Sequence, residues 1–259
     1  MTRQIIAAPR PLEPMPRALI VGASSGVGAA LARELHKQGY VVAVLGRRLP
    51  ELQDLANELN LVRAETAIAY AHNVHNGASV PEVCRSVCAQ IGGLDLFVYC
   101  AGVMYPNNPA TSDTAADLEM LQTNLLGAVA WLNEIGPRMQ SAGSGQIVGI
   151  GSIAGDRGRR GIPAYSASKA GLHTYLEGMR NRLTRHGVTV TTIKLWQVQT
   201  AMLANADRVV RPATPELAAQ LIWRAIRHKR QVVYVPGHWA AAGLVLQHLP
   251  SFIFRRLNL

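Results

Sequence analysis

The chain has 259 residues, of which 49% are hydrophobic, 5% are aromatic and 23 are glycine. Its length suits one α/β domain, and its apolar content excludes an intrinsically disordered chain. The net charge of +10 favours anionic partners, but the basic residues are scattered and lack the signatures of a nucleic-acid-binding protein.

The first 17 residues contain four prolines and lack the continuous apolar stretch of a signal peptide. We expect an extended leader at 1–17 and a single domain at 18–259. Cys84 and Cys88 lie one helical turn apart without further Cys or His residues spaced for zinc. This pattern indicates reduced thiols, no metal site and a cytoplasmic protein.

Strand-like and helix-like apolar patterns alternate along the domain. We expect strands at 18–22, 41–45, 67–71, 94–102, 146–152, 188–195 and 232–236. We expect helices at 26–38, 49–59, 79–92, a long region ending near 138, 164–185 and 215–229. This order predicts a doubly wound, Rossmann-type parallel sheet of about seven strands with helices on both faces. Ligands of such a sheet bind beyond the carboxyl ends of the strands.

A glycine-rich loop, GASSGVG, joins the first expected strand to the first expected helix. Glycines allow a tight turn and a close approach of backbone N–H groups to a pyrophosphate, which the helix N-terminus also attracts. We therefore expect cofactor contacts from all of its residues except the second: Gly22, Ser24, Ser25, Gly26, Val27 and Gly28.

Arg47 and Arg48 end the second strand, where an NAD-binding site usually offers a carboxylate to the adenosine ribose. A guanidinium instead suits a 2′-phosphate. The pair predicts NADP(H) as the cofactor.

Tyr165 and Lys169 lie four residues apart in an expected helix and so share one face. A neighbouring ammonium brings the pKa of a phenol down towards the range of an acid–base catalyst. Ser152 ends the strand before that helix and can hydrogen-bond the same substrate oxygen. The three residues predict proton donation to a carbonyl oxygen.

With Asn124 in LQTNLLGAV, these motifs resemble the short-chain dehydrogenase/reductase family in order and spacing, over nearly the whole chain. The resemblance implies a catalytic tetrad. Tyr165 is the acid or base, Ser152 orients the substrate, Lys169 lowers the tyrosine pKa and binds the nicotinamide ribose, and Asn124 holds a proton-relay water. The family also implies homodimers or homotetramers built from the helices around Asn124 and Tyr165.

The family pattern is altered at three places. Cys100 replaces the usual asparagine before Ala101 and Gly102, Asn73 replaces an aspartate that faces the adenine, and Trp196-Gln197 replaces Pro-Gly. The resemblance still implies cofactor contacts from a set around these changes: Asn73, Val74, Ala101, Gly102, Tyr165, Lys169, Val198 and Thr200.

Arg157, Arg159 and Arg160 lie between the tetrad serine and tyrosine, where a loop borders the substrate entrance in this fold. One interpretation is a solvated basic loop. The other is a substrate-binding loop for an anionic group such as a phosphate.

Residues 237–259 are largely apolar and end near Arg255 and Arg256, but are too short and interrupted for a transmembrane helix. A lid, an oligomer contact and an interfacial membrane segment remain open. With the arginine loop, this tail resembles the branch of the family that contains decaprenylphosphoryl 2-keto-pentose reductases.

The motifs together predict NADPH-dependent reduction of a ketone to a secondary alcohol, or the reverse reaction. The substrate would be a small or lipid-linked carbonyl compound, such as a keto sugar or a 3-oxoacyl compound. One alternative, which the intact tetrad disfavours, is a catalytically impaired NADP(H)-binding sensor or scaffold protein. A nucleic-acid or membrane-surface binder, suggested by the charge, is a further alternative that predicts salt-sensitive binding independent of NADPH.

Overall fold

The computed structural model describes residues 15–105, 113–206 and 209–256. Its strands form one parallel sheet of seven strands in the order β3-β2-β1-β4-β5-β6-β7. The strands are β1 (Arg17–Val21), β2 (Val41–Gly46), β3 (Ala67–Ala71), β4 (Leu96–Tyr99), β5 (Gly145–Ser152), β6 (Val188–Leu195) and β7 (Val232–Val235). The predicted Rossmann-type sheet is confirmed. Most of the predicted leader, residues 1–14, lies outside the described residues.

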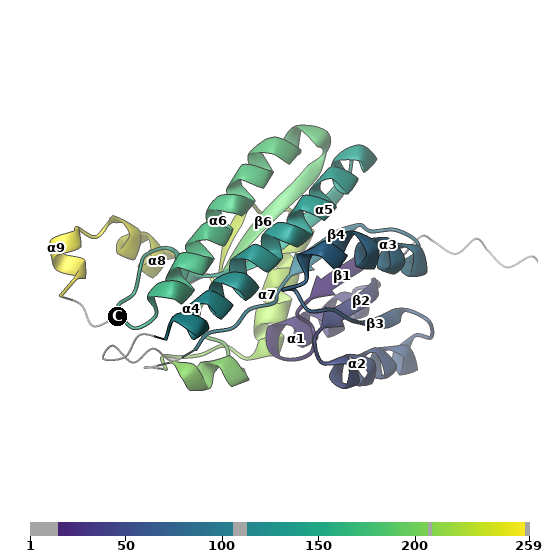
Figure 1. Ribbon diagram of the computed structural model, residues 1–259, viewed down its shortest axis with the longest axis horizontal. Coiled ribbons are helices and arrows are strands. Elements are labelled where there is room, and N and C mark those ends of the chain that lie inside the picture. The colour runs from purple at the N-terminus through teal and green to yellow at the C-terminus, as the bar shows by residue number, and fades with distance from the viewer. Residues whose placement is uncertain (1–14, 106–112, 207–208, 257–259) are drawn as a thin grey trace, which may run out of the picture.

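Helices cover both faces of the sheet (Figure 1). On one face the apolar sides of α1 (Gly26–Lys37), α2 (Leu49–Val62) and α7 (Pro215–Arg227) pack onto the strands. On the other face the packing helices are α3 (Val80–Ile91), α5 (Gly127–Ala142) and α6 (Pro163–Leu183). Because both faces are covered, the central strands are continuous apolar runs, as expected of a parallel sheet.

The long helical region expected to end near residue 138 is interrupted. Residues Thr114–Leu121 form α4, Gln122–Leu126 form a single π-helical segment, and α5 continues to Ala142. The Tyr99 hydroxyl donates to the carbonyl oxygen of Thr123 at 2.6 Å, which gives this carbonyl a partner outside the helix. Such π segments occur often at functional sites, and this one contains Asn124.

The strand order reverses at β1, which lies between β2 and β4. The loops that follow β1 and β4 therefore start side by side: the Cys100 N–H donates to the carbonyl oxygen of Val21 at 2.8 Å. This is the position at which doubly wound sheets bind their ligands.

After β7 the chain forms α8 (Trp239–His248) and α9 (Ser251–Phe254), which project from one end of the molecule (Figure 1). None of the helices in the described part of the chain is long and apolar enough to cross a membrane. The proposed lid, oligomer and membrane-interface roles of 237–259 stay predictions, and residues 257–259 are outside the described ranges.

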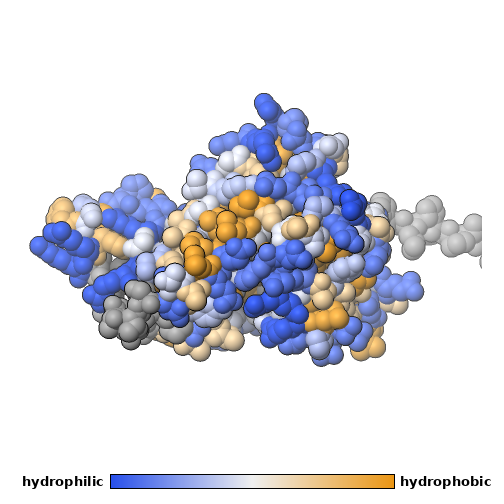
Figure 2. All heavy atoms as spheres, in the orientation of Figure 1, coloured by the Kyte–Doolittle hydropathy of each residue, from blue (hydrophilic) through white to orange (hydrophobic). Residues whose placement is uncertain are grey.

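An apolar patch lies on the outer surface near α5 and α6 (Figure 2). The two helices form a shallow groove lined by Leu125, Leu126, Val129 and Tyr175, and the Leu126 side chain is 51% exposed. The predicted homo-oligomer would be built on these helices, and it stays a prediction.

Candidate active site

The glycine-rich loop after β1 needs glycines, because a Cβ atom at three of its positions would crowd neighbouring atoms. Gly22 has a φ of 93°, and a Cβ atom there would lie 2.4 Å from the backbone nitrogen of Ala101. A Cβ atom at Gly28 would lie 2.1 Å from the carbonyl oxygen of Gly22. Gly26 has a φ of 56°, and a Cβ atom there would lie 3.0 Å from the Thr200 side chain. The loops after β1, β4 and β6 thus close on one another at the sheet edge, as a phosphate cradle requires.

The N-terminus of α1 opens into this cradle. Its N-cap, Ser25, makes no side-chain capping hydrogen bond. Instead, Arg48 Nη2 donates to the hydroxyls of Ser24 at 2.9 Å and Ser25 at 2.8 Å. A guanidinium beside free helix N–H groups forms a cationic site suited to a phosphate.

The two arginines that we predicted to contact the cofactor have different neighbours. Arg48 lies against the glycine-rich loop and also pairs with Glu51 at 3.4 Å. Arg47 points towards Glu119 of α4, with its Nη1 3.8 Å from the carboxylate. Arg48 is therefore the better placed of the two for a cofactor phosphate.

Residues predicted to face the adenine lie after β3. The Asn73 side-chain oxygen accepts from the His75 N–H at 3.1 Å, so it shapes the turn. Val74 is buried, and a Cβ atom at Gly127 would lie 3.0 Å from its Cβ. This loop is therefore packed against the start of α5.

Ser152 and Tyr165 meet beyond the carboxyl end of β5. Ser152 Oγ accepts from the Ala154 N–H at 3.1 Å. The Tyr165 ring is only 8% exposed, and its phenol hydrogen-bonds with the Ser152 side chain. Because the serine oxygen already accepts from Ala154, its own O–H is available as the donor to the phenol oxygen.

The side chains of Lys169 and Asn124 both lie against Gly102. A Cβ atom at Gly102 would lie 3.2 Å from Lys169 Nζ and 3.3 Å from Asn124 Oδ1. Asn124 is fully buried; its amide accepts from the Val103 N–H at 2.8 Å and donates to the Val103 carbonyl at 2.9 Å. The structure thus brings all four tetrad residues to the cradle's edge.

Burial and neighbouring groups act on the pKa of Tyr165 in opposite directions. Burial raises its pKa, and the contributions that oppose this shift are the Ser152 hydrogen bond and the charge of Arg159. The Lys169 ammonium lies 5.8 Å from the centroid of the phenol ring and donates to the carbonyl oxygen of Ile150 at 3.1 Å. Burial lowers the pKa of Lys169 to about 8. The charge of Arg159 therefore opposes the rise in the pKa of the phenol, and the effect of Lys169 on this pKa stays a prediction.

The unusual Trp196-Gln197 pair has a local role. The Trp196 ring stacks on Trp239 of α8 with centroids 3.8 Å apart, and its Nε1 donates to the carbonyl oxygen of Val210 at 2.8 Å. Gln197 Oε1 accepts from the Val210 N–H at 2.6 Å. The stack joins the loop after β6, which carries Val198 and Thr200, to α8, and the two hydrogen bonds to Val210 close this loop on itself.

The three loop arginines have different surroundings. Arg157 Nη1 donates to carbonyl oxygens at the end of α8, including that of Leu246 at 3.0 Å, and its guanidinium lies 4.3 Å from the Phe254 ring centroid. Arg159 faces Tyr165 and lies 5.7 Å from the Trp196 ring centroid. Arg160 is exposed. The charge of Arg159 thus acts on Tyr165, whereas Arg157 contacts the C-terminal helices.

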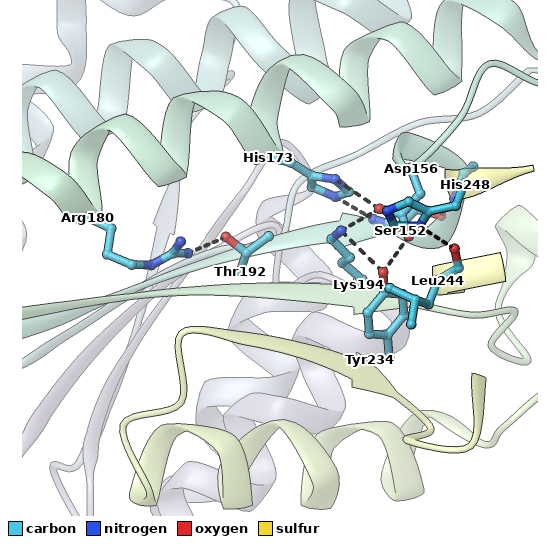
Figure 3. Close-up of polar contacts among 10 residues, drawn as sticks. Ser152, Asp156, His173, Arg180, Thr192, Lys194, Tyr234, Leu244 and His248 are labelled. Carbon is cyan, nitrogen blue, oxygen red and sulfur yellow. Dashed lines mark hydrogen bonds and ion pairs between the residues drawn. The ribbon is translucent and has the colours of Figure 1, made fainter. Parts of the chain in front are cut away.

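Three polar residues close to the tetrad were not predicted. Asp156 contacts Lys194 of β6, and His173 of α6 contacts Ser152 (Figure 3). Two sequence signals were available: a lysine within an apolar strand, and a histidine eight residues after Tyr165, on the same helical face.

Comparison with known proteins supports the resemblance. A family model described as short chain dehydrogenase matches residues 16–210. An uncharacterised oxidoreductase of Myxococcus xanthus is 40% identical over 239 residues, covering 92% of this chain and 94% of that protein. One of Staphylococcus haemolyticus is 33% identical over 190 residues, covering 73% of this chain and 81% of that protein.

Solved structures share the fold. A short-chain dehydrogenase from Sphingobium yanoikuyae in complex with NADPH has a TM-score of 0.81 at 20% identity, covering 94% of this chain and 96% of that one. A variant of the actinorhodin polyketide ketoreductase with NADPH has a TM-score of 0.78 at 25% identity, covering 86% and 96%. The chain is therefore an oxidoreductase of the short-chain dehydrogenase/reductase family.

Proposed function

We propose that the protein reduces a ketone that carries an anionic group to a secondary alcohol, with NADPH as the reductant. The observation that supports this most strongly is the hydrogen bond between Ser152 and the buried phenol of Tyr165, on which the charge of Arg159 also acts. A phenol that hydrogen-bonds with a serine, next to a cation, suits proton donation to a carbonyl oxygen.

NADP(H) fits the residues around the loop. Gly22, Gly26 and Gly28 leave room for a pyrophosphate against the N-terminus of α1. The Arg48 guanidinium, beside the serines of this loop, would bind a 2′-phosphate on the adenosine ribose. The solved structures with NADPH, from a short-chain dehydrogenase and a ketoreductase, agree with this assignment.

The bound cofactor would supply a hydride to the carbonyl carbon. Tyr165 gives its phenolic proton to the carbonyl oxygen, and the resulting phenolate is stabilised by the Ser152 hydroxyl and by the charge of Arg159. A proton from solvent then restores the phenol. Lys169, whose pKa burial lowers to about 8, lies next to Asn124 and can exchange a proton near neutral pH.

The partly buried charge of Arg159 favours an anionic substrate. Its guanidinium is partly buried, lies over the Trp196 ring and interacts with the charges of Tyr165 and Asp156. A desolvated cation gains from a charged partner, so a carboxylate or phosphate on the substrate would stabilise it. Lipid-linked keto sugar phosphates and acidic keto compounds both satisfy this requirement.

Tyr165→Phe tests the proton donor. We expect kcat for ketone reduction to fall at least about a hundredfold, because general acid catalysis contributes this much or more, while the Kd for NADPH stays within twofold. The measurement is the loss of NADPH absorbance over a panel of neutral, carboxylated and phosphorylated ketones. Full turnover by the variant would refute the mechanism. Tight NADPH binding by the wild type without any turnover would favour the sensor alternative.

Arg48→Ala tests the cofactor choice. We expect the Kd for NADPH to rise about tenfold or more, since a charge-assisted phosphate contact contributes about 1.5–3 kcal/mol. The Kd for NADH should change little, and Arg47→Ala should have a smaller effect on NADPH. Fluorescence titration with both nucleotides measures this. An equal loss of NADPH and NADH affinity would mean that Arg48 only shapes the loop.

Arg159→Leu tests the substrate class. We expect kcat/KM for an anionic ketone to fall about tenfold to a hundredfold relative to a neutral analogue, because one charge-assisted contact is lost. Arg85→Leu removes the same charge from an exposed position on α3 and serves as the control. An unchanged preference between the anionic ketone and its neutral analogue would exclude Arg159 as the recognition residue.

A further inference from the structure

A buried ion pair lies behind the loop that carries Ser152. The Asp156 carboxylate pairs with Lys194 Nζ and accepts from the Tyr234 hydroxyl of β7 at 2.7 Å (Figure 3). The Asp156 side chain is only 1% exposed and that of Lys194 is 12% exposed. Burial of an ion pair is weak grounds for stability, because desolvation offsets the attraction. Stability alone therefore does not explain an ion pair at this position.

His173 connects this pair to the catalytic serine. The backbone N–H of Ser152 donates to His173 Nε2 at 3.4 Å, and His173 Nδ1 lies 3.8 Å from Asp156 Oδ1. Since Nε2 accepts a hydrogen bond, the proton of the neutral ring belongs on Nδ1, facing the carboxylate. Burial and the Lys194 charge lower the pKa of His173 to about 4, so the ring is neutral at pH 7.

Two glycines make room for the imidazole on either side of Ser152. A Cβ atom at Gly151 would lie 2.2 Å from His173 Nε2, and one at Gly155 would lie 2.7 Å from His173 Cε1. The ring therefore fills a fitted space under the turn that follows β5. A small shift of this ring would move the backbone of Ser152.

One face of α6 carries both Tyr165 and His173. Tyr165, Lys169 and His173 are spaced four residues apart in α6 and so lie in one row. Tyr165 meets the Ser152 side chain, whereas His173 meets the Ser152 backbone. One helix thus holds both the phenol and the group that fixes its serine partner.

We propose that His173 is a positioning residue: held by the Asp156–Lys194 pair, it fixes the Ser152 backbone so that the serine hydroxyl points at Tyr165 and the substrate carbonyl. This inference rests on the proposed reductase function. The imidazole does not touch substrate in this role. It acts through Ser152, and the Asp156–Lys194 pair acts through the imidazole.

Two His173 variants separate hydrogen bonding from packing. His173→Leu fills much of the space but removes the acceptor, whereas His173→Gln can place an amide oxygen near the position of Nε2. We expect His173→Leu to lower kcat about tenfold, with KM for the ketone and Kd for NADPH within twofold of wild type. We expect His173→Gln to recover kcat to within about threefold of wild type. Thermal unfolding of both variants confirms that each is folded under the assay conditions.

A second measurement does not require turnover. In the free wild-type protein labelled with ¹⁵N-histidine, the His173 signals are assigned by their loss in His173→Gln. We expect a neutral ring at pH 7 with the proton on Nδ1 and an unprotonated Nε2. A protonated Nε2 would overturn the proposal.

The kinetic outcomes are equally decisive. Folded His173→Leu with kcat within twofold of wild type, or His173→Gln as slow as His173→Leu, would overturn the positioning role. A change in KM alone would do so as well. If the wild type reduced no ketone while its imidazole showed the expected tautomer, the proposed function would fail and the geometry around Ser152 would stand.

Discussion

The backbone of the loop after β1 packs directly against the backbone after β4, and the active site is arranged around this contact. Only a residue without a Cβ atom can occupy position 22, since any side chain would collide with Ala101. The contact forms where the strand order reverses, so the N-terminus of α1 opens at the edge of the sheet. Arg48 and the tetrad then lie around the same opening.

The departures from the family pattern are compensated locally. Cys100 keeps its backbone hydrogen bond to Val21, and burial raises the pKa of its thiol to about 11, so it is neutral beside the cofactor site. Trp196 replaces a residue of a simple turn but gains a stacking partner in Trp239. Together with the contacts of Arg157 to α8, this stack fixes the C-terminal helices against both loops that border the tetrad.

Prediction from the sequence succeeded where a short local pattern determines the structure. The buried apolar runs located every strand of the sheet, and the spacing of Tyr165 and Lys169 placed both on one helical face. The π-helical segment around Asn124 was not predicted, because its contact with the Tyr99 hydroxyl of β4 is a tertiary one that no local pattern indicates. Likewise, three arginines in one loop look alike in sequence. Their different roles follow from what α8 and Trp196 bring near them.

The roles of Asp156, His173 and Lys194 depend on tertiary contacts between the turn after β5, a helix and a strand. No local spacing links them, so only the assembled fold shows the network. The same limit applies to the Tyr165 pKa: the charge of Arg159 opposes its rise, and no local spacing between the two residues indicated this.

The most direct test of the reductase function is hydride transfer itself. Purified protein would be incubated with NADPH deuterated at C4 and with carboxylated and phosphorylated ketones, and the products analysed by mass spectrometry. We expect an alcohol that carries deuterium on the former carbonyl carbon, formed fastest from an anionic ketone. NADPH that binds but transfers no deuterium to any of these ketones would contradict it.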